Sequence, residues 1–263
     1  MYKKLLLSML LVTQAQYTLT HIQAVIFAAG KSSRFESKTS KLLTPFNGKP
    51  MILYPTQAVD NLGIPMVVVV GHQRDLMQQT LLNEMPNATI EFAIQEKQLG
   101  TGHALRCAID KLTGDDILML YGDQPLMKSE TIQKLIDAHE QKNAVITIVV
   151  SKRTEPGSYG RIVTDKNGIT KCVEAKDFVG MDPHKHPRVN AGYYLIKRDF
   201  IEKHIDELWM HKNKQEYYIN DLIEIASREG HKINIITVPY EMVHGVNTKN
   251  ELVFAEALMK KTT

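Results

Sequence analysis

Apolar and polar positions follow different patterns in the two halves of the chain. Four short, unbroken apolar runs in the first half are typical of buried strands in a parallel sheet. These runs cover residues 22–28, 65–70, 89–94 and 116–121, and segments with helical periodicity lie between them at 50–62, 72–84 and 101–112. The alternation predicts an α/β fold that is Rossmann-like, with a doubly wound, mainly parallel sheet between two layers of helices.

The second half is expected to extend this sheet with antiparallel strands. After a helical segment at 129–141, strand-like runs follow at 143–151, 160–165, 168–175 and 188–196. Asn167 and Gly168 stand between two of these runs, and an Asn-Gly pair in this position is typical of a hairpin. The remaining pattern predicts helices at 198–208 and 217–229, a strand at 232–238 and a closing helix at 248–260.

Composition and charge exclude some classes of partner. The chain has 263 residues, with 32 Lys and Arg against 29 Asp and Glu, so its formal net charge is only +3. A charge this small and evenly spread does not indicate a nucleic-acid partner. The two cysteines, Cys107 and Cys172, have a spacing that fits neither a disulfide framework nor a zinc site. We therefore expect a protein of a reducing compartment and predict a cytoplasmic location.

The first twenty residues differ from the rest of the chain. Two lysines precede an apolar stretch, Leu5–Val12, which is too short to span a bilayer as a helix. The residues after it make a poor cleavage site for a signal peptidase. We interpret residues 1–20 as an N-terminal extension, either a leader or an extra helix, with export as the alternative. Residues 21–263 are expected to form one domain, and no membrane association is predicted.

Candidate chemistry begins where the first expected strand ends. The loop "AAGKSSRF", residues 28–35, combines a glycine, two hydroxyls and two cations. Such a turn can present backbone N–H groups and positive charge to phosphates, although a basic surface turn is the alternative interpretation. The loop matches neither the Walker A pattern nor the GxGxxG fingerprint, so those two nucleotide-binding classes are excluded.

Polar residues also follow the later strands. Lys41 lies just past the first loop, "QEKQLGTGHA" (95–104) follows the third strand, and "YGDQPL" (121–126) follows the fourth. Ligands of open α/β sheets bind at the carboxyl ends of the strands, so these segments are expected to converge. Asp123 offers hard carboxylate oxygens, and Mg²⁺ needs few of them when water and phosphate complete its shell. The sequence therefore predicts a Mg²⁺ site near Asp123.

Nine motifs resemble, in order, those of the sugar-1-phosphate nucleotidyltransferases. They are "AVIFAAGKSSRF", "SKLLTPFNGKPMI", "QLGTGHAL", "YGDQPL", "YGRIV", "VEAKD", "VNAGYYL", "EYYINDLIEIA" and "GVNTKNEL". The chain is most similar to the uridyltransferase domains of bacterial bifunctional enzymes that also transfer an acetyl group, and the resemblance runs from Ile22 to the end of the chain. It implies the fold of nucleotide-diphospho-sugar transferases, Mg²⁺ as cofactor, and UTP and a sugar 1-phosphate as substrates.

The resemblance also implies a role for individual residues. Those implied for the nucleotide and its phosphates are Phe27, Ala28, Ala29, Gly30 and Lys41, and those for the uracil are Gln95, Gly100 and Thr101. Tyr121 and Gly122 would frame the substrates, Gly160, Glu174 and Asn190 would bind the amino sugar, and Arg34 would face the phosphates. Asp123 and Asn247 would be the protein ligands of Mg²⁺, with Asn247 also at the substrates. Arg34, Lys41 and Asp123 would carry catalysis.

Some of these roles can be checked against the chemistry of the residue types. The amide of Gln95 matches the imide edge of uracil if it is held in one orientation, and leaving such a group unmet costs roughly 1–3 kcal/mol. Glu174 can accept a hydrogen bond from a sugar hydroxyl, or it can be a solvated strand carboxylate. His103 can contact a phosphate, or it can have a packing or capping role at the start of a helix.

The chain departs from the family pattern at several positions. Ser32 stands where the family has glycine, and a serine forced to positive φ is strained. The Ser-Ser-Arg loop does resemble those of cytidylyl- and molybdopterin-guanylyltransferases, which favours phosphate binding more than a particular nucleotide. Ser40 replaces a proline and Asn220 replaces a threonine, so the identity of the sugar stays open.

The 263 residues show no six-residue periodicity of the kind that the hexapeptide β-helix of the bifunctional enzymes needs. Neither acetyl transfer nor a trimer built by that β-helix is therefore expected, and the oligomeric state stays open. The leading hypothesis is Mg²⁺-dependent uridylyl transfer from UTP to N-acetylglucosamine 1-phosphate, which yields UDP-N-acetylglucosamine and pyrophosphate. The alternatives are transfer to another sugar 1-phosphate, such as glucose 1-phosphate, or a weakly catalytic regulatory protein that binds nucleotide sugars.

Overall fold

The computed structural model describes residues 21–262, apart from 36–38, 155–156, 158 and 213. The first half contributes four strands, β1 (Ile22–Ala28), β4 (Met66–Val70), β5 (Ile90–Ile94) and β6 (Asp116–Tyr121). They pair in parallel in the order β6-β1-β4-β5. All four predicted strands are confirmed, and β1 and β6 have the predicted bounds. The extension predicted for residues 1–20 lies outside the described residues.

The second half continues the same sheet with mixed pairing. Its strands are β7 (Ile146–Lys152), β8 (Arg161–Thr164), β9 (Thr170–Val173), β10 (Arg188–Lys197) and β13 (Ile233–Thr237). β10 runs antiparallel to β6, β7 and β8, whereas β13 runs parallel to β7. The sheet of nine strands has the order β13-β7-β10-β6-β1-β4-β5, and the β8–β9 hairpin branches from β10. The predicted α/β class and the antiparallel extension are thus confirmed.

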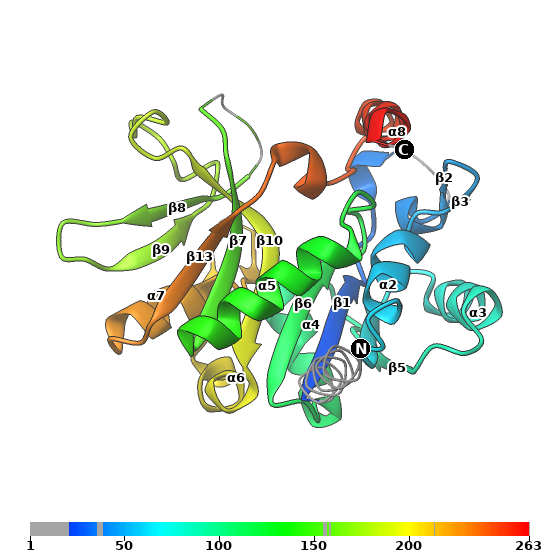
Figure 1. The fold of residues 1–263 in the computed structure, drawn as a ribbon, viewed down its shortest axis with the longest axis horizontal. Helices are drawn as coiled ribbons and strands as arrows, with labels where there is room; N and C mark the ends of the chain where they lie inside the picture. The colour runs from blue at the N-terminus through cyan, green and yellow to red at the C-terminus, as the bar shows by residue number, and fades with distance from the viewer. Residues whose placement is uncertain (1–20, 36–38, 155–156, 158, 213, 263) are drawn as a thin grey trace, which may run out of the picture.

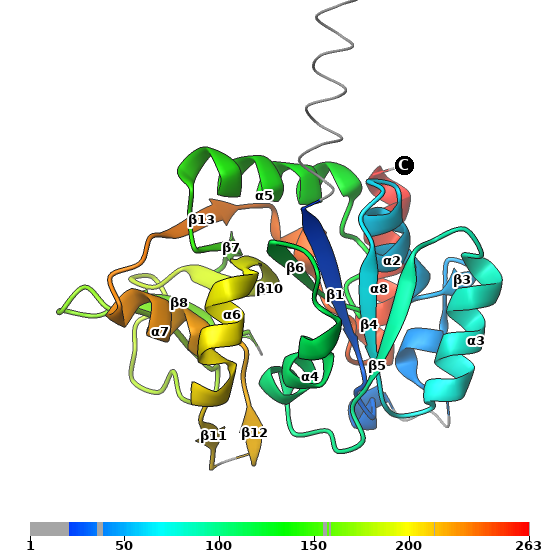
Figure 2. The same ribbon diagram turned by 90° about the horizontal axis from the view of Figure 1, so that it is seen from below.

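Helices cover both faces of the sheet. One face carries α2 (Leu53–Asp60), α3 (Arg74–Glu84) and α5 (Ser129–Lys142), and the other carries α4 (Thr101–Ala108), α6 (Arg198–His204) and α7 (Asp221–Arg228). Figures 1 and 2 show the sheet between these two layers. Side chains of β1 alternate between the two cores, since Ile26 packs in the first and Val25 and Phe27 in the second. This alternation follows from the twofold period of a strand.

Parallel pairing aligns the carboxyl ends of the first four strands. Phe27 of β1 lies beside Tyr121 of β6, and Ala28 lies beside Val70 of β4. The loops that follow these strands therefore open along one edge of the sheet, which is where ligands bind in folds of this class.

Three predicted helices differ from the structure. The helix predicted at 101–112 is α-helical only to Ala108 and continues as a 3₁₀ turn, Ile109–Lys111. The helix predicted at 198–208 ends at His204 and continues as a 3₁₀ turn, Ile205–Glu207. The helix predicted at 217–229 begins only at Asp221, because β12 (Glu216–Tyr217) pairs with β11 (Met210–His211).

The remaining short elements complete the site edge. They are the 3₁₀ turns η1 (Ser33–Phe35), η2 (Lys41–Leu43) and η5 (Tyr240–Val243), the strands β2 (Pro45–Phe46) and β3 (Lys49–Pro50), and the closing helix α8 (Lys249–Thr262). In the described part of the chain, no helix is both long enough and apolar enough to span a membrane.

Candidate functional site

A small polar cluster lies at this edge, just beyond β1 and β6. The Lys41 ammonium donates hydrogen bonds to the Asp123 Oδ2 atom at 2.6 Å and to the Asn247 Oδ1 atom at 2.8 Å. Arg34 adds a second cation, with its Nη2 atom 3.0 Å from the same Asn247 oxygen. The side chains of Lys41 and Asp123 are only 13% and 20% exposed, so their charges are partly shielded from water. The structure brings these four predicted site residues into one network.

A small apolar core beneath the network holds its segments together. Its buried members are Phe35, Phe46, Met51, Leu126, Val246 and Ala255. They come from the first loop, from β2 and the chain around β3, from the segments beside Asp123 and Asn247, and from α8. The Val246 N–H also donates to the Asp123 carbonyl oxygen at 2.8 Å. The packing of residues distant in sequence therefore positions the two oxygen ligands.

Gln124 strengthens this arrangement from beneath. Its Nε2 atom donates to the carbonyl oxygens of Ala191 at 2.6 Å and Val243 at 2.9 Å. Ala191 follows Asn190 in β10, and Val243 ends η5 four residues before Asn247. One buried amide thus ties the Asp123 loop to two other segments that carry predicted site residues. The sequence analysis did not assign a role to Gln124, although it stands directly after Asp123 in the motif "YGDQPL".

Asp123 and Asn247 fit the predicted role of Mg²⁺ ligands. Their oxygens converge on one ammonium, so a cation already lies between them. Among the described residues, no group of three or more His, Cys, Asp or Glu side chains could hold a metal ion. Mg²⁺ does not need such a group where substrate phosphates and water complete its octahedron. A carboxylate oxygen and an amide oxygen suit a Mg²⁺ ion that is shared with phosphates. For this ion to bind, the Lys41 ammonium must move away from at least one of these two oxygens.

The first loop has the strained residue that the sequence suggested. Ser32 has φ of +56°, a left-handed conformation that glycine adopts more readily. Its hydroxyl oxygen accepts a hydrogen bond from the Lys41 N–H at 3.3 Å, which a glycine could not provide. Ser32 therefore links the predicted phosphate loop to the segment that carries Lys41. The phosphate-binding role of the loop stays a prediction.

A cavity of about 240 Å³ adjoins the polar cluster. Its lining includes the predicted site residues Phe27, Ala29, Gly30, Lys41, Gln95, Gly100, Thr101, Tyr121 and Asp123. The side chain of Ala28 instead packs in the core on the other face of the sheet, as the strand period requires. The structure thus places most of the residues predicted for the nucleotide around one hollow.

The residues predicted to recognise the uracil, Gln95, Gly100 and Thr101, all line this cavity. Gln95 is 3% exposed, and its Nε2 atom donates to the Gly100 carbonyl oxygen at 3.0 Å. Gly100 has φ of +93°, and a Cβ atom there would lie 2.4 Å from the Tyr217 carbonyl oxygen, so this position requires glycine. The Thr101 hydroxyl accepts from the Ile219 N–H at 3.2 Å. The His103 Nδ1 atom lies 3.0 Å from the Gln95 Nε2 atom, and His103 does not line the cavity, which favours the packing role over a phosphate contact.

Tyr121 lines the cavity and also contacts Gly192 of β10. Its ring packs against Gly192, where a Cβ atom would come within 2.5 Å of it, and Gly192 itself has φ of +82°. Burial raises the pKa of Tyr121, and the carboxylates of Glu174 and Asp123 raise it further, while a hydrogen bond with Thr101 lowers it. The phenol therefore stays protonated and can act as a hydrogen-bond donor. Gly122 is equally confined, because a Cβ atom there would lie 2.6 Å from Ile52.

The residues predicted for the sugar gather on the antiparallel extension. The Asn190 N–H donates to the Gly160 carbonyl oxygen at 2.7 Å, and a Cβ atom at Gly160 would lie 3.3 Å from the Glu174 Oε1 atom. Asn220 donates to that same Oε1 atom at 2.8 Å. Burial raises the pKa of the neighbouring Cys172 thiol to about 12, so it stays protonated. Gly160, Glu174 and Asn190 do not line the 240 Å³ cavity, and their role in sugar binding stays a prediction.

Several other residues of the cavity were not predicted from the sequence. They are Leu42, Gln98, Ala104, Glu216 and Tyr218, whereas Ser32, which also lines the cavity, belongs to the predicted phosphate loop. The Tyr218 hydroxyl donates to the Glu216 Oε2 atom at 2.9 Å, and both residues reach the cavity because β12 lies beside the start of α4. Their motif, "EYYIND", carries the family resemblance, but only the fold shows that Glu216 and Tyr218 line this cavity.

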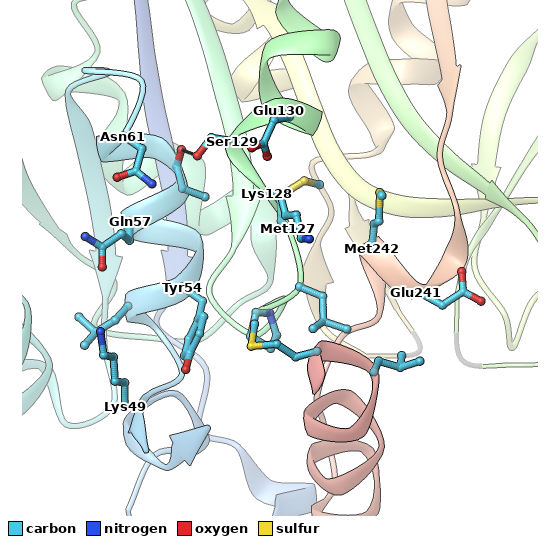
Figure 3. A pocket seen from close by; sticks show the side chains of 16 residues that line it. Lys49, Tyr54, Gln57, Asn61, Met127, Lys128, Ser129, Glu130, Glu241 and Met242 are labelled. Carbon is cyan, nitrogen blue, oxygen red and sulfur yellow. Dashed lines mark hydrogen bonds between the residues drawn. The ribbon is translucent and has the colours of Figure 1, made fainter. Parts of the chain in front are cut away.

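A larger hollow of about 480 Å³ lies elsewhere, between α2, the start of α5 and α8. Figure 3 shows the residues around this hollow, with Tyr54 and Gln57 of α2 on one side and Ser129 and Met242 on other sides. None of the predicted site residues lines it. Size alone therefore does not identify the site, which instead lies where the carboxyl ends of the parallel strands meet.

Comparison with known proteins shows the family of the chain. Residues 24–181 match the family of MobA-like NTP transferase domains. The bifunctional protein GlmU of Anaeromyxobacter dehalogenans is 35% identical over 247 residues, which are 92% of this chain and 50% of that protein. The proteins of the same name from an Exiguobacterium species and Trichlorobacter lovleyi are 35% and 36% identical, over 91% and 90% of this chain and 53% and 52% of theirs.

The chain thus spans about half the length of the curated relatives it matches. The family match includes the first loop, the segment around Gln95, Asp123 and the β8–β9 hairpin. It therefore covers most of the segments that form the cavity, though not Glu216 and Tyr218, together with the start of the antiparallel extension. The chain belongs to the nucleotidyltransferase family of MobA-like NTP transferase domains.

Proposed function

We propose that the protein transfers the uridylyl group of UTP to N-acetylglucosamine 1-phosphate with Mg²⁺ and releases pyrophosphate. The observation that carries the proposal is the network of Lys41, Asp123, Asn247 and Arg34 at the carboxyl edge of the sheet. Two cations and two oxygen ligands meet there beside a cavity lined by Gln95. The nine motifs that resemble the uridyltransferases support the choice of both substrates.

In this reaction an oxygen of the sugar phosphate attacks the α-phosphorus of UTP. The bond from that phosphorus to the bridging oxygen breaks, and pyrophosphate leaves with the electron pair. The attacking phosphate has a second pKa near about 6, so it is mostly ionised at neutral pH and needs no general base. The protein must therefore supply alignment and positive charge rather than a proton acceptor.

The four residues of the network then share two tasks. Arg34 and Lys41 stabilise the charge that develops on the α-phosphate and the leaving pyrophosphate. Asp123 and Asn247 hold the Mg²⁺ ion, which when bound supplies Lewis-acid charge to the phosphates. The partial burial of Lys41 and Asp123 strengthens these interactions, because water screens them less. Loss of one such donor commonly reduces turnover by on the order of 10²–10³.

A different sugar 1-phosphate is the second candidate substrate. Asn220 donates to Glu174, the residue predicted to contact the sugar, and Asn220 stands where the resembling enzymes have threonine. An amide is longer than a threonine hydroxyl, so the oxygen of Glu174 can be offered at a different position. This observation favours a changed sugar preference over a change in the nucleotide.

A regulatory protein that only binds nucleotide sugars is the third candidate. The strained Ser32 in the first loop is the feature that favours it. The paired oxygen ligands and two cations argue against it, because binding alone needs fewer charged groups.

One assay separates these functions. Purified protein and Mg²⁺ are mixed with each nucleoside triphosphate and a panel of sugar 1-phosphates, and pyrophosphate release is measured. We expect release with UTP and N-acetylglucosamine 1-phosphate, and its loss in Asp123→Ala with the fold unchanged by circular dichroism. Release with glucose 1-phosphate alone supports the second function, and no release with any pair supports the third.

A further inference from the structure

The Gln95 amide is held by two groups behind the cavity wall. Its Nε2 atom lies 3.0 Å from the Gly100 carbonyl oxygen and 3.0 Å from the His103 Nδ1 atom. Gln95 lines the cavity, whereas His103 does not. Within the described part of the chain, the Gln95 Oε1 atom accepts no hydrogen bond. The amide thus turns its nitrogen into the protein and leaves its oxygen for a ligand.

The chemistry of the partners determines this orientation. A carbonyl oxygen can only accept, so the amide nitrogen and not the amide oxygen must face Gly100. The second N–H of the same amide then points at the His103 Nδ1 atom, which must carry a lone pair to receive it. In that tautomer the proton of the neutral imidazole lies on the Nε2 atom.

The remaining neighbours of His103 favour the same tautomer. The Cys107 thiol, one turn further along α4, lies 3.8 Å from the Nδ1 atom. Burial raises the pKa of Cys107, so its sulfur stays a thiol and is a second donor toward this nitrogen. Burial and the nearby Arg106 guanidinium lower the pKa of His103, which keeps the ring neutral at pH 7. Two donors therefore face one acceptor nitrogen.

We infer that His103 is a positioning residue that holds Gln95 so that only its amide oxygen faces the base of the nucleotide. The inference rests on the proposed function in placing the base beside Gln95. Uracil presents an N–H group at N3 and can donate to this oxygen. Cytosine presents a lone pair at N3, which an amide oxygen repels. His103 thereby contributes to the choice of UTP over CTP without touching either nucleotide.

Binding of UTP and CTP to the free protein tests the inference without any sugar phosphate. Isothermal titration calorimetry should show that the wild type prefers UTP. His103→Leu removes the acceptor while keeping a side chain of similar bulk, and it should reduce this preference roughly 10-fold, the value of about one hydrogen bond. His103→Asn can place an oxygen near the position of Nδ1 and should restore most of the preference. His184→Leu, the same substitution at an exposed histidine that does not line the cavity, is the control and should leave the preference unchanged.

Thermal unfolding of each variant checks that the fold is retained. A merely structural role would weaken the binding of both nucleotides equally. A ratio of UTP affinity to CTP affinity that stays at the wild-type value in His103→Leu would therefore overturn the inference. A wild type with no preference for UTP, or an Asn variant as unselective as the Leu variant, would overturn it as well. A strong preference for UTP without pyrophosphate release from any sugar phosphate would leave this inference standing and overturn the proposed enzymatic function instead.

Discussion

The Lys41 ammonium donates a hydrogen bond to the Asp123 carboxylate at 2.6 Å, although 82 residues separate the two in the sequence. Lys41 comes from a 3₁₀ turn after the first loop, and Asp123 follows the end of β6. Their contact means that the predicted Mg²⁺ ligand already has a cation when no metal is bound. The proposed metal ion and the lysine would therefore compete for the same oxygen, and each would have a separate part in the proposed reaction.

Lys41→Met tests this competition. We expect Mn²⁺, used as the probe metal, to bind the free variant more tightly by up to roughly fivefold, the value of a partly exposed ion pair. Turnover should nevertheless fall by on the order of 10²–10³, because the phosphates lose a positioned cation. Free Mn²⁺ is measured by electron paramagnetic resonance, and turnover by pyrophosphate release. Lys142→Met, at the exposed end of α5, is the control, and weaker Mn²⁺ binding by Lys41→Met would contradict the competition.

Asn220→Ala tests how Glu174 is positioned. Removing the amide deprives the Glu174 Oε1 atom of its donor at 2.8 Å. We expect the KM for the sugar 1-phosphate to rise by up to roughly 10-fold while the KM for UTP is unchanged, since a hydrogen bond to a charged group contributes about this much. Asn234→Ala is the matched control, because Asn234 also makes one side-chain hydrogen bond, to the Ala138 carbonyl oxygen at 3.0 Å. Equal changes in both KM values would refute this role.

Gly192→Ala tests the close packing of Gly192 against the Tyr121 ring. The new methyl group would meet the Tyr121 ring at 2.5 Å, and the residue would also keep an unfavourable φ of +82°. Gly168→Ala is a matched control, with φ of +83° and nothing within 4 Å of the added atom. We expect Gly168→Ala to lower the free energy of unfolding by about 1 kcal/mol and Gly192→Ala by about 2–4 kcal/mol. Urea denaturation measures both, and similar losses would mean that Tyr121 moves aside without cost.

Asp221 predicts a pH dependence of stability. Burial raises the pKa of its carboxyl to about 7, despite the His211 ring nitrogen 3.0 Å from both oxygens. An acid whose folded pKa lies above its unfolded value favours the folded state at low pH. This contribution is complete below about pH 4 and is lost as the pH rises through about 7.

The comparison with Asp221→Asn isolates this carboxyl. As the pH rises from 4 to 7, the unfolding free energy of the wild type should fall relative to that of the variant by on the order of a few kcal/mol. Urea denaturation at several pH values measures it, and Asp137→Asn on the exposed face of α5 should show no comparable slope. A difference that stays flat over this range would show that Asp221 titrates as in the unfolded chain.

The fold class could be predicted because the local pattern of apolar and polar residues indicates which side chains are buried. The bounds of β1 and β6 agree with the structure to the residue, since unbroken apolar runs between polar ends leave little choice. The start of α7 could not be predicted in the same way. Glu216 and Tyr217 fit a helical pattern, but β12 pairs with β11 instead, and a local pattern contains no information about that partner.

The sequence by itself determined the strand–helix alternation, the edge of the sheet at which ligands bind, and the loops that reach this edge. Only the tertiary structure decided which atoms meet there: the Lys41 ammonium between two oxygens, and the nitrogen of the Gln95 amide turned inward. The hydrophobic periodicity of a strand or helix depends on several residues together, so it predicts the element even if single side chains are displaced slightly. A hydrogen bond depends on a few tenths of an ångström between residues as far apart as Arg34 and Asn247, and only the packing of the whole core sets that distance.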